Sequence, residues 1–153
     1  MAYLSDLSDY NYFQEFWRPS TKAVGWLARD HDFPQAAPSE DLLNRLWQFC
    51  SISVAQTRGG HYCDWCPPKP CIATRMGQSV LLGTSEIRVF SKSGAIYAAP
   101  TLIYHYVDVH SYRQPDEFLR ALFDGPAPPA SDYMQELERF GFDWHRRAPS
   151  KEG

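Results

Sequence analysis

Three of the four cysteines lie close together in the stretch RGGHYCDWCPPKPC, which runs from residue 58 to residue 71. Cys63 and Cys66 have the C-x2-C spacing, which places two thiolates on one tight turn and supplies half of many tetrahedral zinc sites. A structural zinc site needs two more ligands. Cys71 is the nearest candidate for the third ligand, because the prolines between Cys66 and Cys71 restrict the loop that joins them.

The fourth ligand has more than one candidate. His61 lies two residues before Cys63 and faces the same way if the chain there is extended. Folding can instead bring in a histidine from a distant segment, His105 or His110. The sequence therefore predicts a zinc site formed by Cys63, Cys66, Cys71 and His61, with His105 or His110 as the alternative fourth ligand.

Two other roles for these thiols remain open. They can pack as buried groups without a metal, or two of them can form a redox dithiol. A thioredoxin-type pair opens a helix whose dipole lowers the thiol pKa, whereas prolines follow Cys66, so the redox role is the least favoured. Cys50 lies on the apolar stripe of a predicted helix and is expected in the core.

Common catalytic signatures are absent from the sequence. It contains no G-x-S-x-G, H-E-x-x-H, P-loop or G-x-G-x-x-G motif, and it lacks the H-x-E and P-C-x-x-C pair of zinc deaminases. A small metal- or histidine-dependent enzyme with its site around His105 and His110 remains the alternative function. A polar pocket could be lined by Tyr104, Tyr106, Asp108 and His110, with Arg88 on a neighbouring strand, although a solvated sheet face is the simpler interpretation of these residues.

Composition limits the partners. The net charge of -3 gives no electrostatic reason to expect nucleic acid or an acidic membrane surface. No run of residues approaches the length of an apolar membrane span, and the first residues lack the features of a signal peptide, so we expect a soluble, cytoplasmic protein. In a reducing compartment its cysteines would be thiols or metal ligands.

Helical spacing of apolar residues is clearest over residues 40–50, where Ser39 can cap the first amides. Two further helices are predicted over residues 115–125 and 131–141, the first opened by a proline and both ended by a glycine.

Alternation and β-branched residues predict strands over residues 22–28, 51–58, 79–90 and 95–110. A hairpin at residues 91–94 joins the last two, because Gly94 supplies the positive φ that such turns need. On the last strand His105 lies on an apolar face and His110 on the opposite, polar face.

These elements predict an α+β fold: an antiparallel sheet of about four to six strands flanked by two or three helices, with the cysteine-rich loop at one sheet edge. Residues 1–125 are expected to form a single domain. Residues 126–153 would add a proline-rich linker, a short helix and a frayed tail packed on the same domain.

Several spaced motifs resemble a family of small, uncharacterised bacterial proteins. The resemblance rests on VGWLARDHDFP, QTRGGHYCDWC, LGTSEIRVF, YAAPTLIYHYVDVHSY and QPDEFLRAL, which occur in this order between residues 22 and 122. It implies a coherent bacterial domain and brings no established activity with it.

The leading functional hypothesis is a non-enzymatic protein-binding module with a structural zinc in the cysteine-rich loop. A small acidic domain rich in tryptophan and tyrosine, without catalytic motifs, has the composition of an interaction module. Bacterial immunity proteins, which cover the active site of a toxin, are one such class, so the expected partner is another protein.

Overall fold

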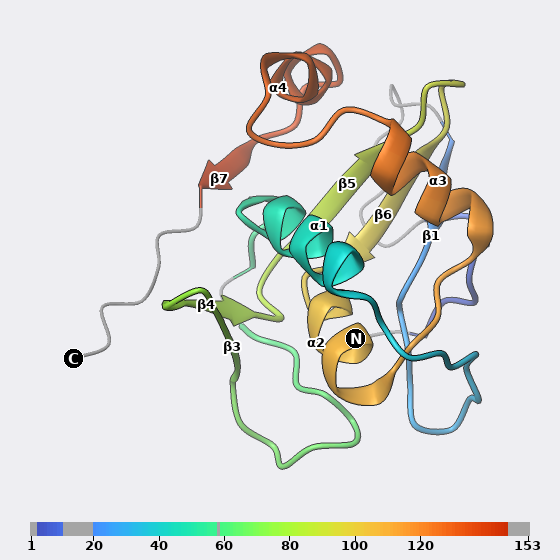
Figure 1. The fold of residues 1–153 in the computed structure, drawn as a ribbon, viewed down its shortest axis with the longest axis vertical. Coiled ribbons are helices and arrows are strands. Elements are labelled where there is room, and N and C mark those ends of the chain that lie inside the picture. Colours follow the sequence, from blue (N-terminus) through green and yellow to red (C-terminus); the bar gives the residue numbers. More distant parts are fainter. Residues whose placement is uncertain (1–2, 11–19, 58, 147–153) are drawn as a thin grey trace.

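The computed structural model describes residues 3–10, 20–57 and 59–146 (Figure 1). In chain order the elements are β1 (Thr21–Ala23), α1 (Glu40–Cys50), β2 (Ile52–Val54), β3 (Cys71–Arg75), β4 (Gln78–Leu82), β5 (Glu86–Phe90), β6 (Ile96–Pro100), α2 (Ile103–His110), α3 (Asp116–Asp124), α4 (Ser131–Arg139) and β7 (Trp144–Arg146). The predicted α+β class is confirmed.

The main sheet has five strands in the order β1-β6-β5-β2-β7. The sequence predicted an antiparallel sheet, but this sheet is mixed. Strand β1 pairs in parallel with β6, while the other pairs are antiparallel. The predicted hairpin between β5 and β6 is present, with Gly94 at φ 96°. In Figure 1, α1 and α3 lie across one face of this sheet, and α2 lies beyond the end of β6.

Helix α1 has the predicted bounds. The Ser39 hydroxyl accepts a hydrogen bond from the Leu42 amide at 3.1 Å, which caps the first turn. The inward stripe is buried, and Cys50 belongs to the core as expected. This stripe packs against the sheet and α2 and forms much of the hydrophobic core.

Leu46 on this stripe is fully buried, so Leu46→Ala should lower the free energy of unfolding by about 2 to 5 kcal/mol through lost burial and the cavity left behind. Chemical denaturation measures the change. Leu81→Ala, the same substitution at a partly exposed leucine, is the matched control and should cost less. Equal losses in the two variants would contradict the packing described.

The prediction of one long strand over residues 95–110 is wrong in its second half. Strand β6 ends at Pro100, and residues 103–110 form helix α2. Alternating β-branched and aromatic residues favour a strand locally, but burial of Ile103, Tyr104, Tyr106 and Val107 follows a helical period and decides the conformation. Long-range packing overrides local propensity here.

The ends of α2 have local causes. Thr101 and Leu102 turn the chain after β6, with the Tyr106 amide donating to the Leu102 carbonyl at 2.9 Å. Ser111 ends the helix in the left-handed region at φ 56°, and its amide donates to the Tyr106 carbonyl. His105 therefore lies in the first turn of the helix, and His110 is its last residue.

Strands β3 and β4 form a separate two-stranded sheet. Met76 and Gly77 connect them with φ angles of 50° and 74°, which is the geometry of a tight type I′ turn. The Arg75 guanidinium ties this hairpin to both neighbouring helices: it pairs with Glu40 and donates to Asn44 Oδ1 at 2.9 Å on α1 and to the Tyr104 hydroxyl at 3.4 Å on α2.

The C-terminal part differs from the expectation in two ways. Residues 3–10, 20–57 and 59–146 contain four helices instead of two or three, because α2 joins the three that were predicted. Two residues assigned to the tail, His145 and Arg146, lie in β7, which pairs with β2, and their side chains are exposed. The rest of the predicted tail lies outside the described residues.

In the described part of the chain, no helix has the length and apolar character needed to cross a membrane.

Candidate metal centre

The loop between β2 and β3 carries Cys63 and Cys66 on one turn. The Cys66 amide donates to the Cys63 carbonyl at 3.3 Å, which closes the turn. Burial raises the pKa of the Cys63 thiol to about 11 and the neighbouring Cys66 thiol adds to the rise, while the main-chain amides of Trp65 and Cys66 act in the opposite direction. Main-chain amides near a cysteine sulfur favour the thiolate, which is the form that binds a metal.

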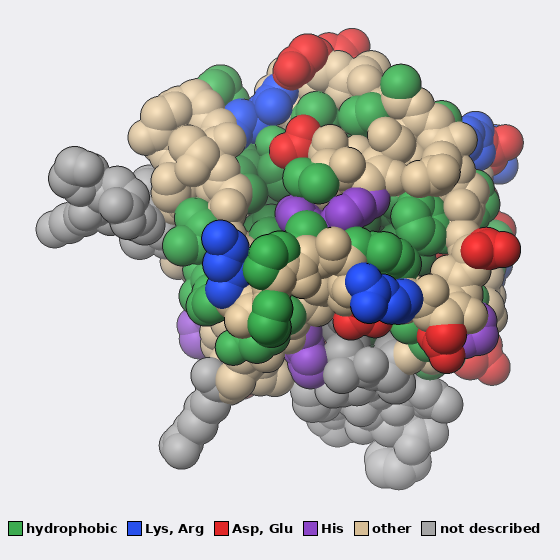
Figure 2. All heavy atoms as spheres, turned by 90° about the horizontal axis from the view of Figure 1, so that it is seen from below, with side chains coloured by type: hydrophobic (Ala, Val, Ile, Leu, Met, Phe, Trp, Pro, Cys, Tyr) green, Lys and Arg blue, Asp and Glu red, His purple; other side chains and the backbone are tan. Residues whose placement is uncertain are grey.

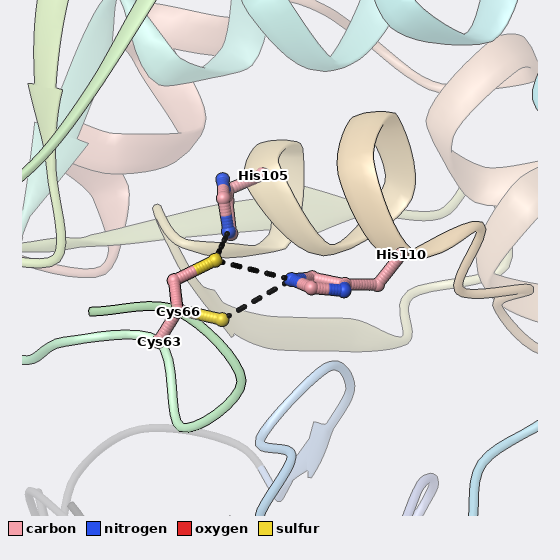
Figure 3. Close-up of side chains that lie close together, drawn as sticks. All are labelled: Cys63, Cys66, His105 and His110. Carbon is pink, nitrogen blue, oxygen red and sulfur yellow. Dashed lines mark hydrogen bonds between the residues drawn. The ribbon is translucent and has the colours of Figure 1, made fainter.

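Helix α2 brings two imidazoles to the same place (Figure 3). His110 Nε2 lies 3.3 Å from Cys63 Sγ and 3.6 Å from Cys66 Sγ, and His105 Nε2 lies 3.4 Å from Cys66 Sγ. The two imidazole rings are 5.1 Å apart between centroids and nearly perpendicular. Both histidines thus direct the same ring nitrogen toward the two sulfurs.

These distances suit a single ion. In a tetrahedron with bonds of about 2.3 Å to sulfur and about 2.0 Å to nitrogen, a sulfur and a nitrogen ligand are separated by about 3.5 Å. Three of the four sulfur–nitrogen distances lie between 3.3 and 3.6 Å and bracket that value. All four ligand atoms lie within 4.8 Å of one another. The cluster of Cys63, Cys66, His105 and His110, named here the Cys2His2 cluster, has the geometry to hold a metal ion.

The electrostatic setting favours ligation by histidine. Burial lowers the pKa of both imidazoles, and the neighbouring His110 lowers that of His105 further. The neutral imidazole is the form that binds a metal, so these side chains need not lose a proton first at neutral pH. The Cys63 thiol differs from the two imidazoles, because its raised pKa keeps it protonated at neutral pH. A metal that binds its sulfur must therefore displace the proton.

Trp65, between the two cysteines, anchors the turn on α2. Its ring lies 5.6 Å from that of His110 and 6.0 Å from that of Tyr106, and Phe33 packs against its other side at 5.3 Å. The neighbouring Asp64 accepts a hydrogen bond from the Arg29 amide at 3.1 Å. These contacts position the two sulfurs opposite α2.

The structure separates the sequence-predicted ligands into two groups. Cys63 and Cys66 meet both alternative histidines, His105 and His110, in the Cys2His2 cluster. Cys71 is the first residue of β3 and lines a hollow beside Cys66 without entering the cluster. His61 is held by its main chain, whose amide donates to the Gly83 carbonyl at 2.9 Å, and is likewise outside the cluster.

One spacing signal points to the second pair. His105 and His110 form H-x4-H, which together with C-x2-C is a common zinc-ligand spacing. On a strand these two histidines would face opposite sides, so the strand prediction concealed the pair. On α2, with His110 at the helix end, they converge.

The polar face predicted for an enzyme pocket does not exist as such. Because α2 is a helix, Tyr104 and Tyr106 are buried, against Trp47 and Trp65 respectively, while Asp108 is exposed. Only His110 of that set belongs to the cluster.

The four cysteines are free thiols in the structure. A family model described as "Domain of unknown function (DUF7919)" matches residues 2–123, a range that includes the whole Cys2His2 cluster. No curated protein and no solved structure matches the chain.

Proposed function

The chain belongs to the DUF7919 family, and we propose that it is a non-enzymatic protein-binding module whose fold is held by a structural zinc ion. The observation that carries the proposal is the convergence of Cys63, Cys66, His105 and His110 within 4.8 Å. This convergence gives the metal hypothesis a defined set of ligands. The expected uncharacterised family is confirmed separately, by the family model that matches residues 2–123.

The donor atoms favour zinc. Magnesium and calcium take oxygen ligands, whereas two thiolates and two imidazoles in a tetrahedron suit zinc. A two-iron cluster with two cysteines and two histidines would place the cysteines on one iron and the histidines on the other. Here His110 Nε2 is 3.3 Å from Cys63 Sγ and 3.6 Å from Cys66 Sγ, which supports one shared ion.

A structural role follows from the number of ligands. Catalytic zinc sites keep a position open for water or substrate, whereas four protein ligands complete a tetrahedron. The ion would join the loop after β2 to α2, two segments separated along the chain by the β3–β4 hairpin, β5 and β6. Such a cross-link fixes a loop that has little secondary structure of its own.

A binding role is supported by apolar side chains exposed near the cluster. Ile72 is 58% exposed and Val109 55%, and both line a hollow together with Cys66 and His105. Figure 2 shows histidine side chains near the centre of this face of the molecule, with hydrophobic side chains around them. Exposed apolar groups gathered on one face are typical of protein-interaction sites.

Metal analysis of the purified protein tests the proposal. We expect about one zinc per chain, because the four ligands form one tetrahedral site. Cys63→Ser should lose the metal, since a hydroxyl is a much weaker zinc ligand than a thiolate, and Cys71→Ser, the same change outside the cluster, should keep it. Metal-free protein with a native melting curve, or equal zinc loss in both variants, would overturn the proposal.

A further inference from the structure

A hollow of about 270 Å³ opens beside the Cys2His2 cluster. Its walls come from three segments: Cys63, Cys66, Pro67, Lys69 and Pro70 of the loop, Cys71 and Ile72 of β3, and His105 and Val109 of α2. Most of these groups are apolar. The volume is that of a recess for one or two side chains, smaller than the usual site for a drug-sized ligand.

Strand β3, along this hollow, has one free edge. The two-residue turn makes Arg75 and Gln78 a hydrogen-bonded pair, and pairs alternate from there along the hairpin. The main-chain N–H and C=O groups of Ile72 and Thr74 therefore point away from β4. Within the described residues, no other strand pairs with β3 and no other main-chain hydrogen bond uses these groups.

Two features keep this edge in place. Arg75 fixes the end of β3 to α1 and α2, as described above. The inward face of the hairpin is anchored by Val80 and Leu82, which are buried in the core. The outward face carries the opposed pair Ile72 and Leu81, both exposed. An exposed apolar strand with a free edge invites pairing with another strand.

Lys69 adds a charge preference. Lys69 lines the hollow, and its ammonium takes part in none of the ion pairs among the described residues. A partner carboxylate would complement it, while a partner cation would be repelled.

We propose that an extended segment of a partner protein adds as a strand to the free edge of β3, places an apolar side chain in the hollow, and directs an acidic side chain to Lys69. Main-chain hydrogen bonds to Ile72 and Thr74 would supply affinity, and the hollow and Lys69 would supply specificity. This inference rests on the proposed zinc-stabilised module, because three cluster residues, Cys63, Cys66 and His105, form part of the wall of the hollow.

Selection from a library of random twelve-residue peptides displayed on phage, against the immobilised full chain, tests the inference. The enriched peptides should combine an acidic residue, a large apolar residue and β-branched neighbours. Synthetic copies should bind with affinities reduced at least about tenfold by Lys69→Glu or Ile72→Thr. Replacing the peptide's acid by lysine should restore binding to the Lys69→Glu protein.

Two controls separate this site from a general effect. Lys92→Glu makes the same charge change in the distant β5–β6 turn and should leave binding unchanged. Methylation of alternate peptide amides should abolish binding, because it removes the donors needed for strand pairing. Zinc content and thermal melting are measured for each variant, so that a lost fold is not taken for a lost contact.

The outcomes are distinct. A zinc-containing protein that enriches no peptide, or peptides that bind the Lys69→Glu and Ile72→Thr proteins as tightly as the parent, would overturn the docking inference and leave the zinc module standing. If zinc-free protein selects such peptides, the structural zinc of the proposed function is overturned, while docking at the edge of β3 stands. A concentration-dependent dimer that Ile72→Thr abolishes would assign the edge to a second copy of the chain and also overturn the inference.

Discussion

Removing the zinc should abolish the cooperative thermal transition of the protein or lower its free energy of unfolding by at least about 5 kcal/mol. Structural zinc contributes roughly 10 to 16 kcal/mol of apparent binding energy in small zinc-dependent domains, comparable with the whole stability of an ordinary domain. The effect should reach the core, since α2 carries two cluster ligands and also buries Tyr104 and Val107.

Calorimetry before and after treatment with a strong chelator measures this change. One equivalent of zinc added to the stripped protein should restore the transition, whereas magnesium should not, because it prefers oxygen ligands. Superimposable melting curves with and without metal would contradict a structural role.

His110→Ala should weaken zinc binding more than about a hundredfold. Even residues that only support a ligand cost 10- to 100-fold in metal affinity when they are replaced, and His110 contacts both sulfurs directly. The loss should also destabilise the zinc-loaded protein, since Trp65 packs on the same ring. Competition with a chromophoric chelator measures the affinity.

His61→Ala is the matched control for that experiment. It removes the same type of side chain, here from the loop that carries Cys63 and Cys66, but His61 lies outside the cluster. Its zinc affinity should stay within a few-fold of the parent. A larger loss for His61→Ala than for His110→Ala would show that the ligand set proposed here is wrong.

Local signals in the sequence were enough to predict much of the fold. The helix at residues 40–50 combines a serine cap with a stripe of apolar residues, and the structure confirms both. Gly94 marks the hairpin between β5 and β6, which the structure also contains. In each case the cause lies within a few residues of its effect.

Two features depend on contacts between distant segments. The parallel pairing of β1 with β6 joins residues 21–23 to residues 96–98, and no local pattern specifies it. The sequence of α2 has the local pattern of a strand. Its helical conformation depends on contacts with two distant segments, in which Trp47 packs against Tyr104 and Trp65 packs against Tyr106.

The strand predicted for residues that form α2 also affected the prediction of the candidate site. Cys63 and Cys66 were predicted as a ligand pair from spacing alone, because two close cysteines need no tertiary information. His105 and His110 were left as alternatives, since a strand would direct them to opposite faces. Only the helical conformation makes H-x4-H a second pair opposite the first.

X-ray absorption at the zinc edge tests most directly the central claim that one ion is shared by Cys63, Cys66, His105 and His110. The account predicts two sulfur neighbours at about 2.3 Å and two nitrogen neighbours at about 2.0 Å, in a spectrum unchanged by Cys71→Ser. Three sulfur neighbours that fall to two in Cys71→Ser, or an oxygen neighbour from an open position, would contradict it.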